Sequence, residues 1–234
     1  NLLYNYEYIN SASKEDDKKK LDFIIYFHIQ RILFGFNSRK ITEFTSLDLK
    51  AYLLSSLLLK KINETEIDYI KFIVDNQIDK IGMHKSYNFL EHSKFINNLN
   101  EIKNILLFFK SKKSNVFDEV ILKMTSILNE YFHLDGSLAL FNGTNNVYTI
   151  NIFNSLNKES YLKKRDFSNI NNGIAFYSDK KKRVFFDVVQ PNKDRISSNL
   201  NAGTLSFEIS GYGEKIFTNC GASESLGKNP EYLR

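Results

Sequence analysis

The sequence contains one cysteine, two prolines and no tryptophan among its 234 residues. The single thiol, Cys220, excludes an intramolecular disulfide and a zinc site built from cysteines, so cysteine usage does not indicate a redox compartment. No apolar run reaches the roughly 20 residues that cross a bilayer as a helix. The chain begins at Asn1 without a methionine or a signal peptide. We expect both ends to be cut, so the missing targeting segment excludes no location.

Charge is nearly balanced. The chain is 42% hydrophobic and 25% charged, as globular domains are, which argues against disorder of the whole chain. Most of the net charge of +5 lies after residue 150, where 13 Lys and Arg face 9 Asp and Glu. The basic run 180–183 could attract a polyanion or form a solvated hairpin turn. No recognition motif or interleaved aromatic residue accompanies it, so we expect no nucleic-acid partner.

The first part of the chain has helical periodicity. Five segments place apolar side chains near the 3.6-residue spacing that buries one stripe of a helix. They span residues 23–34, 49–58, 67–78, 95–109 and 116–128. Ser46, Asp48 and Ser114 are the expected N-caps. Short polar loops between helices of similar length predict a layer of antiparallel helical hairpins over residues 1–140.

The pattern changes near His133. Asp135-Gly136 and Asn142-Gly143 are turn signals, and short β-type runs follow them. These runs span residues 147–153, 174–177, 183–189, 204–209 and 215–218. In 204–209, Leu205, Phe207 and Ile209 alternate with polar residues, which predicts a strand that buries its apolar face. Gly211-Tyr212-Gly213 should form a hairpin turn.

Together these patterns predict an α+β protein with helices first and an antiparallel sheet second. We expect a helical domain over 1–140, a linker and first strand region over 141–170, and a β-domain over 171–234.

Three stretches carry a resemblance to a known family. The first is Gly82-Met83-His84-Lys85-Ser86-Tyr87-Asn88, and the second is Asp135-Gly136-Ser137-Leu138-Ala139-Leu140-Phe141-Asn142-Gly143. The third is Asn201-Ala202-Gly203-Thr204-Leu205-Ser206-Phe207-Glu208, followed by Phe217-Thr218-Asn219-Cys220-Gly221-Ala222. In this order and spacing, at the change from helix to strand, they resemble heparinase II/III-type polysaccharide lyases over essentially the whole chain.

The resemblance implies an incomplete (α/α) toroid followed by the start of a β-sandwich. It also implies a periplasmic or cell-envelope protein that cleaves acidic, uronate-containing polysaccharides by β-elimination. That chemistry needs a group that stabilises the developing enolate charge beside the uronate carboxylate. It also needs a base for the C5 proton and an acid for the leaving glycosidic oxygen. The family uses Asn, His or Arg for the first task, and Tyr or His for the others.

His84 and Tyr87 are the catalytic candidates. His84 matches the family's histidine in this stretch, and the alternative is a structural histidine at a helix start. Tyr87 stands where the family usually has Arg and could act as a phenolic acid or base, although it is one of thirteen tyrosines. The two would share a face if this segment were helical. Asn88 could bind a substrate carboxylate, but its favoured role is the N-cap of the next helix.

Asn201 and Asn219 depart from the family pattern. Many members have His at the position of Asn201, some also at that of Asn199, and an Asp in the later turn where Asn219 stands. Asn is a poor zinc ligand, so we expect no zinc here. Asn201 could still bind substrate. These departures leave open a second hypothesis, a glycan-binding or envelope-processing relative that has lost elimination chemistry.

The remaining histidines and the cysteine are interpreted as structural. His92 is too loosely spaced from His84 for a metal site. His133 is interpreted as a residue at the C-terminal end of a helix, where the helix dipole favours it. His28 is interpreted as a core or groove histidine. Cys220 reads as a small packed residue because no base lies near it in sequence.

Overall fold

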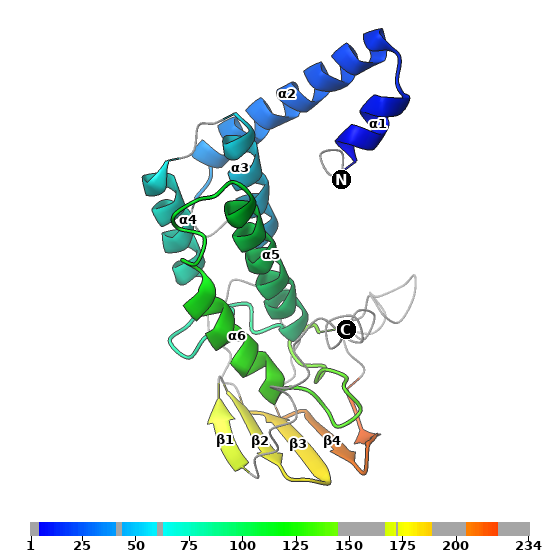
Figure 1. Cartoon of the computed structure of the whole chain (residues 1–234). Coiled ribbons are helices and arrows are strands. Elements are labelled where there is room, and N and C mark those ends of the chain that lie inside the picture. The colour runs from blue at the N-terminus through cyan, green and yellow to red at the C-terminus, as the bar shows by residue number, and fades with distance from the viewer. Residues whose placement is uncertain are drawn as a thin grey trace.

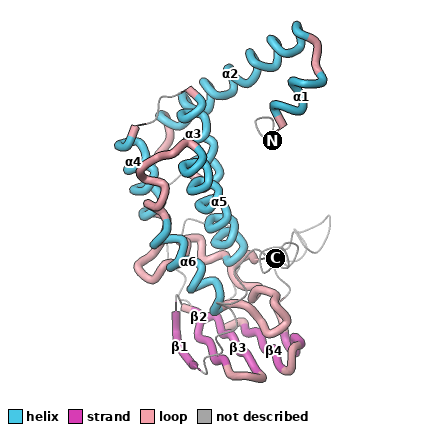
Figure 2. Tube along the Cα trace, viewed as in Figure 1, coloured by secondary structure: helices cyan, strands magenta, loops and turns pink. Residues whose placement is uncertain are grey.

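The computed structural model describes residues 5–40, 44–59, 63–144, 167–171, 173–188 and 205–219. The helices are α1 (Tyr6–Ala12), α2 (Glu15–Asn37), α3 (Ser46–Leu58), α4 (Glu64–Asn76), α5 (Phe89–Phe108) and α6 (Asp118–Glu130). The strands are β1 (Phe167–Asn171), β2 (Ile174–Ser178), β3 (Lys182–Asp187), β4 (Phe207–Gly211) and β5 (Glu214–Phe217). Figures 1 and 2 show helices above a single sheet, with α2 extending away from the rest. The predicted α+β class is confirmed.

Local sequence explains where α3 begins, but not as predicted. Thr45 is the N-cap, its side chain accepts from the backbone N–H of Asp48, and the Asp48 carboxylate accepts from the backbone of Thr45. This is a capping box, which satisfies two N–H groups that the helix itself leaves without partners. The expected caps Ser46 and Asp48 are therefore wrong, because both lie inside the helix. Ser114 is also wrong, since α6 starts after Phe117 without a side-chain cap.

A single hydrophobic core joins the helices to the sheet. Tyr131, at the end of α6, is fully buried and stacks on Phe89 of α5 with 4.3 Å between ring centroids. The same ring contacts Phe176 of β2 at 6.1 Å and Phe185 of β3 at 6.3 Å. Fully burying aromatic rings is worth roughly 1.5–3 kcal/mol each. The helical part and the sheet are thus held together by ring packing.

The sheet is an antiparallel meander in the order β1-β2-β3-β4-β5. The predicted turn between β4 and β5 is confirmed: Tyr212 and Gly213 have φ values of 55° and 89°. Two successive residues with positive φ give the type of turn that fits the right-handed twist of a hairpin. Among the described helices, none is long and apolar enough to cross a membrane.

The prediction of which face of β4 is buried was wrong. Glu208 and Ser210 are fully buried, whereas Phe207 is 40% exposed and Leu205, just before the strand, is 72% exposed. Glu208 faces the segment that follows α6, where it contacts His133 and Leu140. The alternation was therefore correct, but its inward face is the polar one. Phe207 instead stacks on Phe186 of β3 across the outer face. The expected run 147–153 lies outside the described residues.

Candidate active site

The segment with the catalytic candidates is a loop between α4 and α5. His84 forms a β-bridge with Ile78, and the N–H of Tyr87 donates to the carbonyl of His84 at 2.9 Å. Gly82 and Tyr87 have φ values of 103° and 53°, which are incompatible with a helix. His84 and Tyr87 therefore do not share a helical face, and the first helical residue is Phe89.

Asn88 is the N-cap of α5, as favoured from the sequence. Its Oδ1 accepts from the backbone N–H groups of Leu90 and Glu91 at 2.9 and 3.0 Å. Its Nδ2 donates to the carbonyl of Asn142 at 3.0 Å, and Asn142 Nδ2 donates to the carbonyl of Tyr87 at 3.1 Å. These two side-chain-to-backbone bonds fix the 82–88 loop against the turn that ends the helical part. Asn88 therefore has one further Nδ2 hydrogen that could donate to a substrate carboxylate.

His92 links the 82–88 loop to α6 by hydrogen bonds. Its Nδ1 accepts from the backbone N–H of His84 at 3.0 Å, and its Nε2 lies 2.9 Å from the carbonyl of Met124 on α6. These two contacts assign the proton to Nε2. Burial lowers the pKa of His92 to about 4, against the opposing effect of the Met124 carbonyl. The structural reading of His92 is confirmed.

This buried histidine predicts a pH-dependent stability. An unfolded histidine binds a proton near pH 6.5, whereas folded His92 does so only near pH 4. The unfolded state therefore binds more protons between these values, and stability falls as pH decreases from about 6.5 to 4. The shift corresponds to about 3 kcal/mol from this residue. Urea unfolding at a series of pH values should show this loss, and His92→Gln should reduce it. An equal slope in both proteins would contradict the assignment.

His84 is a neutral hydrogen-bond donor. Its Nδ1 faces the hydroxyl of Ser86 at 2.8 Å and accepts from the Ser86 backbone N–H at 3.3 Å. These contacts assign its proton to Nε2. The ring packs on Phe95 with centroids 4.9 Å apart. Burial lowers the pKa of His84 to about 4, and the charge of Glu91 opposes the shift. A neutral imidazole with Nε2–H can stabilise developing negative charge without removing a proton.

Tyr87 is positioned beside a carboxylate. Its hydroxyl lies 3.5 Å from Asp79 Oδ2. The other oxygen of Asp79 accepts from the backbone N–H groups of Ile81, Gly82 and Met83 at 3.0, 2.9 and 2.8 Å. These three bonds fix the Asp79 carboxylate and the turn that precedes His84. The phenol has the chemistry to carry a proton, and the fixed carboxylate limits where its hydroxyl lies.

Sequence reasoning missed the pair His133–Glu208. His133 Nε2 lies 2.6 Å from Glu208 Oε2, and both side chains are fully buried. Glu208 Oε1 also accepts from the backbone N–H groups of Leu140 at 3.2 Å and Asn219 at 2.9 Å. The interpretation of His133 as a helix-end residue is wrong, because α6 ends three residues earlier at Glu130. The signal of this pair in the sequence was Glu208, a charged residue within the alternating run 204–209.

The three stretches that resemble the family meet at this junction. Residues 82–88 are tied to 135–143 by the bonds from Asn88 Nδ2 to the Asn142 carbonyl and from Asn142 Nδ2 to the Tyr87 carbonyl. Residues 135–143 are tied to β4 by the bond from Leu140 to Glu208. The same carboxylate accepts from Asn219, which lies in the later turn. Segments more than 120 positions apart in the sequence therefore form one continuous hydrogen-bonded structure.

Asn219 does not fit the zinc site that the family resemblance implies. Asn219 supplies an amide where a carboxylate would be needed, and its backbone is bonded to Glu208. Within the described ranges, no three His, Cys, Asp or Glu side chains are grouped as metal ligands. Asn199, Asn201 and Cys220 lie outside those ranges.

The basic run and the grooves lie elsewhere. Lys180, Lys181 and Lys182 are exposed around the β2–β3 turn, as the solvated-turn reading expects. Arg183 instead points inward, and its Nη1 donates to the carbonyl of Phe132.

One groove lies between α2 and α3 and includes His28, and a second lies between the end of α4 and α6. Neither groove is lined by the candidates of the 82–88 loop.

Comparison with known proteins agrees with this architecture. Residues 163–234 match the family described as heparinase II/III-like, C-terminal. The chain carries a heparinase II/III-like C-terminal region. The match confirms the family resemblance over the part of the chain that holds the third stretch. No curated protein sequence matches the chain.

Solved structures extend the heparinase likeness to the helices. Heparinase III is 13% identical, with a TM-score of 0.67 over 91% of this chain and 40% of that chain. Heparan sulfate lyase HepC from Pedobacter heparinus is 12% identical, with a TM-score of 0.59 over 86% of this chain and 36% of that chain. At such identities the likeness shows the fold alone. The chain thus spans well under half the length of either lyase.

Proposed function

We propose that this chain is part of a polysaccharide lyase that cleaves uronate-containing acidic glycans by β-elimination. The observation that supports the proposal most is the convergence of residues 82–88, 135–143 and the 208–219 region at one junction. The C-terminal family match and the two lyase folds support it independently. An incomplete toroid, the start of a sandwich, and a location in the periplasm or cell envelope belong to the same proposal.

The proposed reaction assigns different tasks to the two candidates. A base removes the proton from C5 of the uronate, and the electron pair forms the C4–C5 double bond. The C4–O bond then breaks, and the leaving glycosidic oxygen takes up a proton. The neutral Nε2–H of His84 would donate to the carboxylate as it acquires enolate charge. Tyr87 would carry the proton, as base, acid or both in turn. Asn88 and Asn201 remain the proposed contacts to substrate.

The hydrogen bonds of His84 favour its assignment as the charge-stabilising donor, with Tyr87 as the proton carrier. A base must present a lone pair, and the lone pair of neutral His84 is occupied by Ser86. Its Nε2–H is the atom that remains for a substrate. Such a donor is effective at neutral pH because the imidazole stays uncharged above about pH 4. The carboxylate of Asp79 lies near the phenol of Tyr87.

A product assay tests the proposal directly. The full-length protein is incubated with a panel of acidic polysaccharides, and the ultraviolet absorbance of the unsaturated uronate product is followed. We expect product from at least one uronate-containing polymer and none from a neutral glucan. Saturable binding of acidic polymers without absorbance would instead identify a glycan-binding relative that has lost elimination. Absence of both would remove the proposal.

A further inference from the structure

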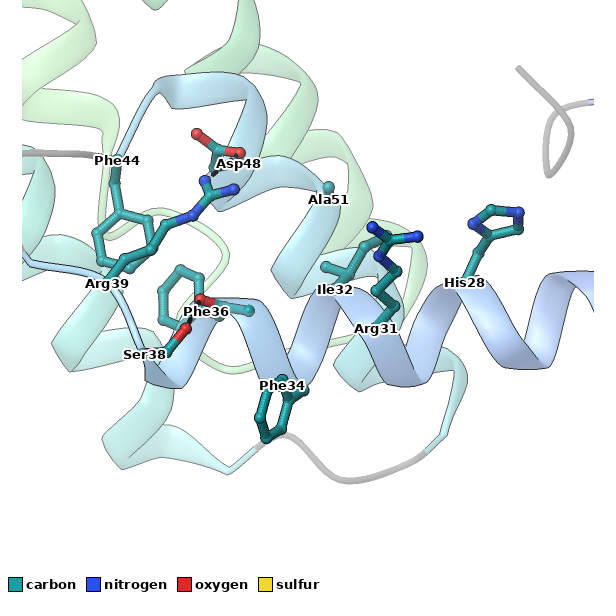
Figure 3. A pocket seen from close by; sticks show the side chains of 11 residues that line it. His28, Arg31, Ile32, Phe34, Phe36, Ser38, Arg39, Phe44, Asp48 and Ala51 are labelled. Atoms are coloured by element: carbon teal, nitrogen blue, oxygen red, sulfur yellow. Dashed lines mark hydrogen bonds and ion pairs between the residues drawn. The ribbon is translucent and has the colours of Figure 1, made fainter.

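The groove between α2 and α3 is a second place where an acidic sugar fits. It has a volume of about 400 Å³, within the usual range of small-ligand sites. Figure 3 shows Arg31 and His28 on α2, with Ala51 and Asp48 of α3 across the groove from Arg31. Figure 1 shows α2 and α3 at the end of the molecule away from the sheet. This groove is therefore remote from the 82–88 loop.

The groove has an excess of positive charge. Arg39 Nη1 lies 3.0 Å from Asp48 Oδ1, so this pair neutralises itself at one wall. Arg31 has no ion-pair partner among the residues that the structure describes. Arg31 and His28 are three residues apart on α2 and so lie on one side of the helix. A guanidinium can bind a carboxylate or a sulfate through two parallel N–H bonds.

The floor of the groove is buried and apolar. Phe36 and Phe44 are buried, with ring centroids 4.3 Å apart, and Phe36 also stacks on Tyr52 at 3.7 Å. Above them, Gly35 leaves the helix surface open, because a Cβ atom added there would meet nothing within 4 Å. An apolar floor beside a cation suits a ligand with one apolar face and one anionic group.

We propose that this groove binds one anionic sugar unit, as a second site on the same glycan chain. The carboxylate or sulfate would pair with Arg31, and the sugar ring would lie over Gly35 against the aromatic floor. The proposal rests on the proposed function for its class of ligand. A remote site of this kind would hold a long polymer while a distant unit lies at the 82–88 loop, which raises effective concentration without new catalytic contacts.

Two substitutions test the groove by different means. Arg31→Ala removes the cation, and Gly35→Leu fills the space without changing charge. Gly35 lies inside a helix, so replacing it should strengthen α2 and not unfold it. The matched controls are Gly35→Ala, which leaves the space mostly open, and Lys112→Ala, which removes an exposed cation elsewhere.

The measurement is calorimetric titration of the full-length protein at low salt. The probes are an unsulfated tetrauronate, a sulfated heparin tetrasaccharide and neutral cellotetraose. We expect each of the two variants to weaken one anionic site about tenfold or more. Arg31→Ala removes charge-assisted hydrogen bonds, whereas Gly35→Leu occupies the place of the sugar ring. The controls should change affinity less than twofold. Comparing the two anionic probes shows whether carboxylate alone suffices or sulfate is needed.

The outcomes separate this inference from the proposed function. If both test variants bind as the wild type does, or if cellotetraose binds equally well, the groove is not an anionic sugar site. Unsaturated product formed by both variants at the wild-type rate would then leave the lyase proposal intact. If affinity depends on Arg31 and Gly35 while no polymer yields product, the lyase proposal fails and the groove assignment stands.

Discussion

Replacing Glu208 by Ala should destabilise the fold by about 3–5 kcal/mol, because it removes the acceptor of several hydrogen bonds at a buried site. Glu208 is fully buried on β4 and lies 2.6 Å from His133. The same carboxylate accepts from the backbone N–H groups of Leu140 and Asn219. Its loss would leave several buried donors without an acceptor, and each such group costs about 1–3 kcal/mol.

Urea unfolding at neutral pH measures this effect. Glu214→Ala is the matched control, because Glu214 is an exposed glutamate on the neighbouring strand, and its loss should cost less than about 0.5 kcal/mol. The double variant His133→Leu with Glu208→Leu should recover part of the loss, since neither side chain is then left buried without its partner. A cost for Glu208→Ala below about 1 kcal/mol would show that the pair does not hold the sheet to the helices.

Replacing Tyr87 by Phe should lower turnover by about 10²- to 10⁴-fold, the contribution typical of a positioned acid or base. The substitution removes only the hydroxyl that lies 3.5 Å from Asp79 Oδ2. The aromatic ring remains, so its packing against the core and its positive φ should be retained. The expected change is therefore in kcat, with KM nearly constant.

A second pair of variants distinguishes the role of His84. His84→Gln retains an N–H donor, whereas His84→Phe does not, and we expect the second to lose more turnover because charge stabilisation is lost. Tyr26→Phe, at a 54% exposed tyrosine on α2, is the control for loss of a phenol. Rates of unsaturated product formation measure all four proteins. Turnover unchanged in Tyr87→Phe would exclude this phenol as the proton carrier.

Periodicity identified most elements because burial of one stripe is a local property. The five helical segments correspond to α2–α6, and four of the five predicted strands correspond to β2–β5. Two elements were missed. Helix α1 has seven residues and buries none of them, so it leaves no apolar stripe to detect. Strand β1 spans only five residues, Phe167–Asn171, where no β-type run was predicted. All but its last residue fall in the linker and first strand region expected over 141–170.

The candidate site was predictable only in part. Asn88 as N-cap and His92 as a structural histidine followed from local chemistry. The relative placement of His84 and Tyr87 could not be predicted in this way, because positive φ at Gly82 and Tyr87 makes this segment a loop and not the expected helix. The protonation state of His84 depends on burial, which no local pattern reveals.

The sequence by itself determined the order of elements, the turn at Tyr212-Gly213 and the family resemblance. These depend on periodicity, backbone preference and short motifs, which act within a few residues of one another. Only the tertiary structure decided that the inward face of β4 is the polar one. Glu208 can be buried there because His133, 75 positions earlier, lies opposite it. A buried carboxylate is stable only where its partner is already placed, and packing of the sheet on the helices determines that placement.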